Sequence, residues 1–177
     1  MFHSSRACRP ERRTLELAQP YLWPPRDGLC STWMKCDSRG MNGKITASCL
    51  CGSVRISCGM PAGPAAYCHC EDCRKCTGSA FNVSVPFEAG TFRVTSGEIG
   101  SFAKIADSGN ELTRHFCRTC GSPLYTSSRG HPDRVYVKAG ILDDPSLVEP
   151  AHQSWCQSKV SWATLPPDLP GHERDGR

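Results

Sequence analysis

Hydrophobic and polar residues alternate along the chain in short runs that glycine and proline separate. Short alternating runs bounded by turn residues are typical of β-strands, and no helical periodicity longer than about three turns interrupts them. Strands are expected at residues 44–50, 53–57, 65–69, 80–86, 91–95, 101–106, 112–116, 124–127, 134–139 and 152–158. Helical turns are expected only over 71–77 and 145–148. The pattern predicts a mainly β domain with few short helical turns.

The two ends of the chain differ from this pattern. Residues 1–40 show no periodicity and carry a net charge of +3, so we expect a disordered N-terminal extension. Residues 166–177 are rich in proline and charge, without an apolar pattern, and are expected to be a disordered tail. The folded domain is predicted at 41–165.

Composition indicates what stabilises such a domain. Leu, Ile, Val and Phe account for only 30 of the 177 residues, yet the net charge of +4 is too small for a typical disordered chain. The 13 cysteines could compensate for the thin core, as disulfides or as metal ligands. The first 30 residues contain no apolar core of a secretory signal, and the chain has no 18-residue apolar run. We therefore expect a cytoplasmic, reducing location and zinc-bound cysteines, with no membrane partner.

Two cysteine pairs far apart in the sequence have the spacing of zinc ligands. In Cys49-Leu-Cys51 both side chains point to one face of a strand, and in Cys117-Arg-Thr-Cys120 a tight turn brings the two sulfurs together. Together they would supply the four sulfurs of a closed, structural zinc site. Such a site would join the first strand to a late one and add on the order of 10 kcal/mol of metal binding to folding.

A third cluster, Cys68, Cys70 and Cys73, offers three sulfurs within six residues. Three ligands leave a fourth position of a tetrahedral zinc open, which is typical of catalytic or substrate-binding sites. Cys76 follows at helical spacing and could supply a fourth sulfur that closes the site. Spacing alone also allows both ions to be purely structural. His69, between two ligands on a strand, should point away from the metal.

Arg74 and Lys75 come directly after this cluster. They could hold the carboxylates of an anionic ligand or lower thiolate pKa values. The alternative is an exposed basic pair with no ligand.

These motifs resemble those of the glutathione-dependent formaldehyde-activating enzyme family, whose domain is shared with centromere protein V. The resemblance covers residues 43–169. Its pieces are Cys49-Leu-Cys51-Gly-Ser-Val, Tyr67-Cys68-His-Cys70-Glu-Asp-Cys73-Arg-Lys, Thr77-Gly-Ser, Phe116-Cys117-Arg-Thr-Cys120-Gly-Ser-Pro, Ala139-Gly-Ile-Leu-Asp-Asp-Pro and Ser158-Lys-Val-Ser-Trp162.

The resemblance implies a mainly β fold, a small zinc-binding domain of twisted antiparallel sheets with few short helical turns, and two zinc ions per chain. It implies a structural zinc on Cys49, Cys51, Cys117 and Cys120, and a catalytic zinc on the other three cysteines. The implied reaction adds glutathione, or a similar thiol, to formaldehyde and gives S-hydroxymethylglutathione, a carbon-sulfur lyase reaction run in reverse. A small-molecule thiol and an aldehyde are then the expected partners. The assignment of Arg74 and Lys75 to the thiol's carboxylates is our own addition.

A non-catalytic zinc module that binds a protein or chromatin is the alternative, as the centromere relative suggests. Residues 41–177 carry a net charge of only +1, and their aromatic residues are not interleaved with Lys or Arg. Nucleic-acid binding would need a basic stripe, so the sequence disfavours it.

Overall fold

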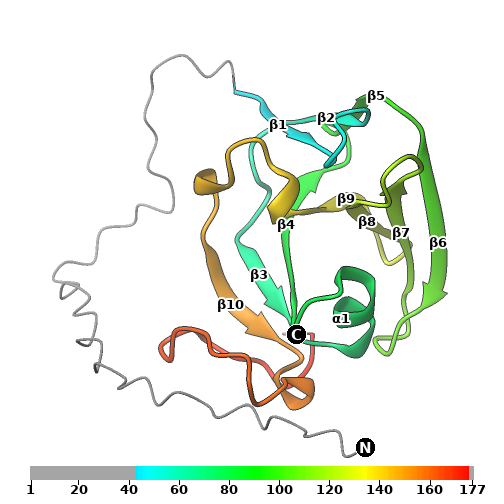
Figure 1. Ribbon diagram of the computed structural model, residues 1–177. Coiled ribbons are helices and arrows are strands. Elements are labelled where there is room, and N and C mark those ends of the chain that lie inside the picture. The colour runs from blue at the N-terminus through cyan, green and yellow to red at the C-terminus, as the bar shows by residue number, and fades with distance from the viewer. Residues whose placement is uncertain (1–42, 176–177) are drawn as a thin grey trace, which may run out of the picture. The chain divides into compact units, whose positions relative to one another are not determined.

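Two β-sheets make up the described part of the chain, residues 43–175, in this computed structural model (Figure 1). Residues 1–42, where the N-terminal extension is expected, lie outside the described residues, as do 176 and 177. The small sheet is antiparallel, in the order β1 (Ile45–Ser48), β2 (Arg55–Cys58), β5 (Arg93–Ser96). The large sheet has the order β10-β3-β4-β9-β8-β7-β6. Its strands are β3 (Ala65–Cys68), β4 (Asn82–Glu88), β6 (Ile99–Ile105), β7 (Glu111–Cys117), β8 (Pro123–Ser128), β9 (His131–Lys138) and β10 (Pro150–Ser154).

Helical structure is short throughout the described residues. Helix α1 (Glu71–Thr77) begins after Cys70, whose sulfur accepts a hydrogen bond from the Cys73 amide. It ends at Gly78, whose φ of 65° is the left-handed conformation that favours glycine at a helix end. Three single turns of 3-10 helix follow, Ala139–Ile141, Pro145–Leu147 and Cys156–Ser158.

The predicted mainly β fold is confirmed, and each expected strand has a counterpart with slightly different ends. Two local expectations are wrong. The strand expected at 152–158 ends at Ser154, because Trp155 takes a φ of 58° and the chain turns. Strand β10 pairs with β3 in parallel, whereas all other pairs are antiparallel. A parallel pair requires a long crossover, and six strands lie between β3 and β10.

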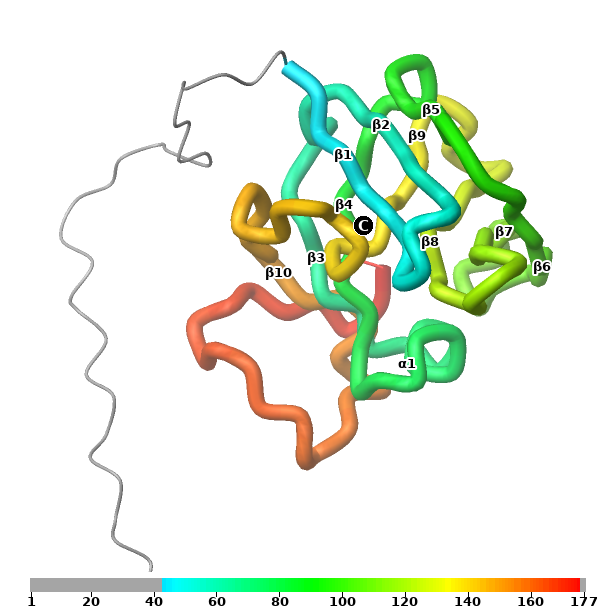
Figure 2. The backbone as a smooth tube through the Cα atoms, turned by 45° about the horizontal axis from the view of Figure 1, so that its top comes forward, coloured from blue at the N-terminus to red at the C-terminus, as the bar shows by residue number. Residues whose placement is uncertain are grey.

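The hydrophobic core lies between the two sheets. Figure 2 shows β1 and β2 in front of β4, and buried residues of both sheets form one cluster. Val85 and Phe87 of β4 and Val137 of β9 are fully buried on this face, opposite Ile56 of β2. Because side chains alternate along a strand, the intervening residues of β4 and β9 point to the other face of the large sheet. That face is polar, and it carries the pocket described below.

The tail expected to be loose contains a segment that contacts β10. Gln153 N donates to Pro170 O at 2.8 Å, and His172 N donates to Gln153 O at 2.9 Å. Further along, Cys156 N donates to His172 O at 3.0 Å. Since β10 ends the large sheet, its outer backbone groups lack a strand partner, and this segment satisfies them.

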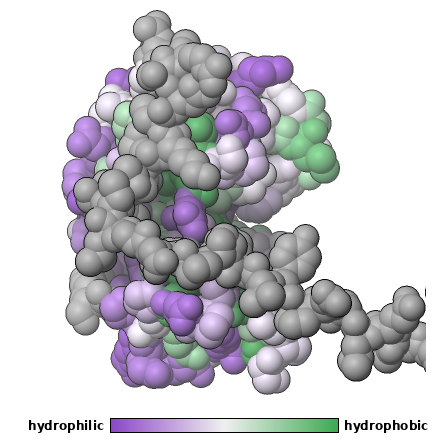
Figure 3. Space-filling model, turned by 90° about the vertical axis from the view of Figure 1, so that its left-hand side faces the viewer, coloured by the Kyte–Doolittle hydropathy of each residue, from purple (hydrophilic) through white to green (hydrophobic). Residues whose placement is uncertain are grey.

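The outer surface is mixed in polarity. Figure 3 shows polar residues over much of one side, with hydrophobic residues in smaller patches. Large hydrophobic side chains such as Leu50 and Trp162 are exposed singly, which is normal for a protein surface. Within residues 43–175, no helix combines the length and hydropathy needed to cross a membrane.

Candidate metal centres and substrate pocket

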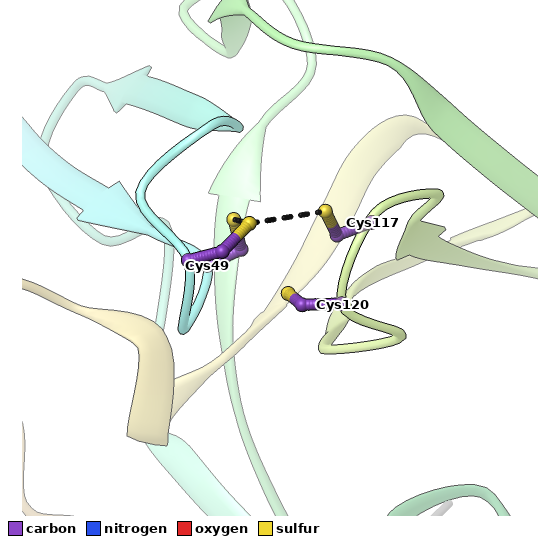
Figure 4. Close-up of side chains that lie close together, drawn as sticks. Cys49, Cys117 and Cys120 are labelled. Carbon is purple, nitrogen blue, oxygen red and sulfur yellow. Dashed lines mark hydrogen bonds between the residues drawn. The ribbon is translucent and has the colours of Figure 1, made fainter.

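Four cysteine sulfurs converge where the turn after β1 meets the turn after β7. They belong to Cys49, Cys51, Cys117 and Cys120, and all lie within 4.8 Å of one another. Cys51 Sγ lies 3.4 Å from Cys49 Sγ and 3.9 Å from Cys117 Sγ. Four sulfurs around a tetrahedral zinc at 2.3 Å would be about 3.8 Å apart, so this spacing fits zinc. Figure 4 shows Cys49, Cys117 and Cys120 turned toward this common centre, from both sheets.

Hydrogen-bond donors surround these sulfurs. The Ser53 hydroxyl lies 3.0 Å from Cys51 Sγ, 3.4 Å from Cys117 Sγ and 3.6 Å from Cys49 Sγ. Burial raises the pKa of Cys49, but the Val54 amide and the Ser53 hydroxyl outweigh it and lower that pKa to about 7. The Ser122 hydroxyl, 3.2 Å away, lowers the pKa of Cys120 to about 5. The donors therefore stabilise the thiolate form that a metal requires.

The second cluster is local in sequence. Cys68 ends β3, Cys70 precedes α1 and Cys73 lies in its first turn, with the three sulfurs within 4.8 Å of one another. A hydrogen bond from the Cys70 thiol lowers the pKa of Cys68 to about 3, whereas the hydrogen bond with Cys68 raises the pKa of Cys73. Cys76 is not part of the group. Within residues 43–175 the cluster therefore offers three ligands, which fits a zinc with one free coordination position.

A pocket of about 470 Å³ lies over the polar face of the large sheet and includes these three cysteines in its wall. Residues at alternate positions of β4, β9, β8 and β7 form its floor. Its charged residues include Arg114, Arg134, Lys138 and Asp72. The four-cysteine cluster does not contribute to this wall among the described residues. One cluster therefore faces a space that a small molecule can enter, and the other does not.

A known protein family matches most of the chain. A family described as "Glutathione-dependent formaldehyde-activating enzyme" matches residues 44–158. The chain belongs to this family. A curated protein of Halomonas elongata, named "Putative glutathione-dependent formaldehyde-activating enzyme", is 29% identical over 127 residues, covering 68% of this chain and 80% of that protein. A crystal structure of a Rhodobacter sphaeroides protein is 21% identical, with a TM-score of 0.47, and covers 72% of this chain and 98% of that one.

In this family member, Asp72 connects the cysteine-bearing helix to the far wall of the pocket. Asp72 Oδ1 lies 2.6 Å from Lys104 Nζ on β6, and Oδ2 lies 3.0 Å from Arg114 Nη2 on β7. The Arg114 and Asp72 side chains are only 12% and 19% exposed. Because Asp72 directly precedes Cys73, these ion pairs fix where α1 presents that sulfur.

The basic pair predicted to bind carboxylates occupies a different place. Arg74 Nη1 donates to the carbonyl oxygens of His69 at 2.7 Å and Ser158 at 2.5 Å. Lys75 is exposed and pairs with Glu71 at 2.7 Å. Neither side chain contributes to the pocket wall. Arg74 instead joins the loop between Cys68 and Cys70 to the turn after β10 through these two hydrogen bonds.

His69, expected to point away from the metal, is fully buried, with Nε2 3.2 Å from Gln153 Oε1. It is not one of the clustered ligands.

Sequence reasoning missed the polar residues of the pocket floor. Asn82 and Ser84 alternate with Val83 and Val85 along β4, and Tyr136 and Lys138 alternate with valines along β9. A signal for this floor was available in the sequence. A central strand covered on both faces would be apolar throughout, so polar residues at every second position indicate that one face of the sheet is open.

Proposed function

We propose that this protein catalyses the addition of a glutathione-like thiol to formaldehyde, or to a related small aldehyde, as a zinc-dependent carbon-sulfur lyase acting in reverse. One observation supports this most strongly. The three sulfurs of Cys68, Cys70 and Cys73 lie together in the wall of a pocket of about 470 Å³, without a fourth protein ligand among residues 43–175.

The donor set fits zinc better than the harder cations. Three thiolates suit zinc, whereas magnesium and calcium prefer oxygen ligands. Zinc bound there would supply a Lewis acid that lowers the pKa of a fourth, external sulfur ligand. The closed cluster of Cys49, Cys51, Cys117 and Cys120 would hold a second zinc with a structural role.

The chain's own contribution to the reaction is positioning. The thiolate sulfur forms a bond to the aldehyde carbon, the carbonyl π pair moves to oxygen, and that oxygen takes up the proton released by the thiol. The pocket would hold thiol and aldehyde side by side and thereby remove the entropy cost of their encounter. The ion pairs of Asp72 with Lys104 and Arg114 would keep Cys73 in place during the reaction.

The test compares wild type with Cys68→Ser. Metal content per chain and the rate of hydroxymethyl-thiol formation, corrected for the spontaneous reaction, are measured with glutathione and formaldehyde. We expect two zinc ions and a faster reaction for wild type, and one zinc ion and the spontaneous rate for the variant. Cys156→Ser, outside both clusters, is the matched control and should behave as wild type. Two bound zinc ions without any acceleration would contradict the proposal and favour the non-catalytic zinc module.

A further inference from the structure

Two largely buried side chains on the pocket floor have polar ends without a partner among the described residues. Lys138 is 7% exposed and Asn82 is 4% exposed, and both contribute to the pocket wall. Within residues 43–175, neither the Lys138 ammonium nor the Asn82 side-chain amide has a hydrogen bond or ion pair, and neither group is among the fully buried unpaired polar atoms, so both reach the open space of the pocket. A few polar groups that converge on a largely enclosed pocket are the usual means by which a protein orients a ligand.

The sheet register places these two residues in line with the three-cysteine cluster. Asn82 lies directly opposite Cys68, where β4 pairs with β3. Lys138 lies opposite Ser84, one strand further across and two residues further along. With strands about 4.8 Å apart and a rise of about 3.4 Å per residue, the Cα atom of Lys138 is about 12 Å from that of Cys68. The three residues therefore form a diagonal row across the floor.

The other cations of the pocket have anionic partners. Arg114 pairs with Asp72 at 3.0 Å, and Arg134 has a carboxylate oxygen of Asp133 at 3.6 Å. Among the lysines and arginines that the described residues place in the pocket wall, Lys138 is thus the one without an anionic partner. An ammonium in a pocket attracts a carboxylate more strongly than one on the open surface, because less water screens the two charges.

We infer that Asn82 and Lys138 form a subsite for a peptide thiol, in which Lys138 binds a carboxylate and Asn82 hydrogen-bonds the peptide group nearer the sulfur. The inference rests on the proposed function, because that function brings the sulfur to the three-cysteine cluster. An extended residue spans about 3.3–3.6 Å, and the side chains of Cys68 and Lys138 cover part of the distance between their Cα atoms. A ligand whose carboxylate lies one or two peptide units from its sulfur can therefore reach from the three-cysteine cluster to Lys138. The site therefore selects acidic peptide thiols over neutral or cationic ones.

Binding, measured by calorimetry with two probes, tests the subsite separately from the chemistry. S-methylglutathione keeps both carboxylates but has a blocked sulfur, whereas glutathione diethyl ester keeps the thiol and masks the carboxylates. For wild type we expect S-methylglutathione to bind and the ester to bind at least about tenfold more weakly than glutathione, because a charge-assisted hydrogen bond is lost.

Lys138→Met removes the charge at nearly constant side-chain length. We expect it to weaken S-methylglutathione binding at least about tenfold, to leave ester binding unchanged, and to keep both zinc ions. Lys138→Arg should recover part of the affinity, because it restores the charge. Lys44→Met, at an exposed lysine outside the pocket, is the matched control and should bind as wild type.

Equal binding of S-methylglutathione by Lys138→Met and wild type would overturn the inference. Equal affinity of wild type for glutathione and its diethyl ester would also overturn it, and that comparison needs no variant to fold. Catalysis that survives with either result would leave the proposed function standing. Conversely, Lys138-dependent binding of S-methylglutathione without acceleration of the formaldehyde reaction would support the subsite and contradict the proposed function.

Discussion

The two cysteine clusters use the same ligand atom in different surroundings. Cys49, Cys51, Cys117 and Cys120 come from two sheets, and the Cys49 and Cys117 side chains are buried. The other cluster comes from one stretch of six residues, and all of its members are half-buried beside a pocket. Figure 1 shows this stretch, with α1, at the opposite end of β3 and β4 from the small sheet. A metal in the first cluster would hold distant strands together, and a metal in the second would meet a ligand.

The polar groups around the sulfurs also differ between the two clusters. Serine hydroxyls and a backbone amide contact the four-cysteine cluster, so its hydrogen-bonding groups belong to the protein. In the three-cysteine cluster Cys70 Sγ also accepts a hydrogen bond from the Cys73 amide, but the side-chain amide of the neighbouring Asn82 has no partner within residues 43–175. Two features therefore distinguish a closed metal site from one that can accept a ligand: the number of cysteines, and whether the neighbouring polar groups already have protein partners.

The largest expected effect is that Cys49→Ser unfolds the domain while Cys68→Ser does not. Structural zinc contributes about 10 kcal/mol or more of binding free energy to folding, and Cys49 belongs to the cluster that joins the two sheets. Cys68→Ser should lose one zinc and remain folded, because its cluster spans a local loop. Circular dichroism during heating, with metal content measured on the same samples, checks both. Equal destabilisation by the two changes would show that the clusters share the structural role.

Gly97→Ala perturbs the closed cluster without changing a cysteine. Gly97 has a φ of 85°, and a Cβ atom there would lie 2.5 Å from the carbonyl oxygen of Ser53. The strain and the clash should cost about 2–4 kcal/mol of unfolding free energy. Because Ser53 contacts three of the sulfurs, zinc of this cluster should also be lost at lower chelator concentration.

Urea unfolding and titration with a zinc chelator measure both effects of Gly97→Ala. Gly90→Ala is the control, since a Cβ there meets no atom within 4 Å and the residue lacks the left-handed φ of Gly97. If the Gly97 variant lost the zinc of the three-cysteine cluster first, the two clusters would be coupled rather than independent.

Much of the architecture and both ligand groups could be predicted from local patterns. Alternation and turn residues locate the strands, and the Cys-x-Cys and Cys-x-x-Cys spacings identify which sulfurs can share an ion. These patterns involve residues close together in the sequence, so they can be recognised without knowing how the core packs.

The pocket could not be predicted in the same way. Its floor depends on strand order and register, which place Asn82 beside Cys68 and Lys138 one strand beyond. Adjacency in sequence suggested Arg74 and Lys75 as the cations near the ligand, but a short helix turns consecutive side chains in different directions. The parallel pairing of β10 with β3 could not be predicted from local patterns either, because the two strands are more than 80 residues apart in the sequence.

The smallest expected effect concerns how firmly the pocket holds Cys73. Asp72→Asn removes the charge that pairs with Lys104 and Arg114, so α1 should shift relative to β6 and β7 while both zinc ions remain bound. We expect the rate of the formaldehyde reaction to fall about tenfold, because small displacements of a reacting group are costly, with only a slight fall in melting temperature. Glu71→Gln, one residue earlier, breaks only the exposed pair with Lys75 and should leave rate and melting temperature as in wild type. Stopped-flow rates and melting curves for both variants provide the measurement. A rate unchanged by Asp72→Asn would mean that the three cysteines hold their geometry without support from the far wall, and the contrast between the clusters would then rest on ligand number alone.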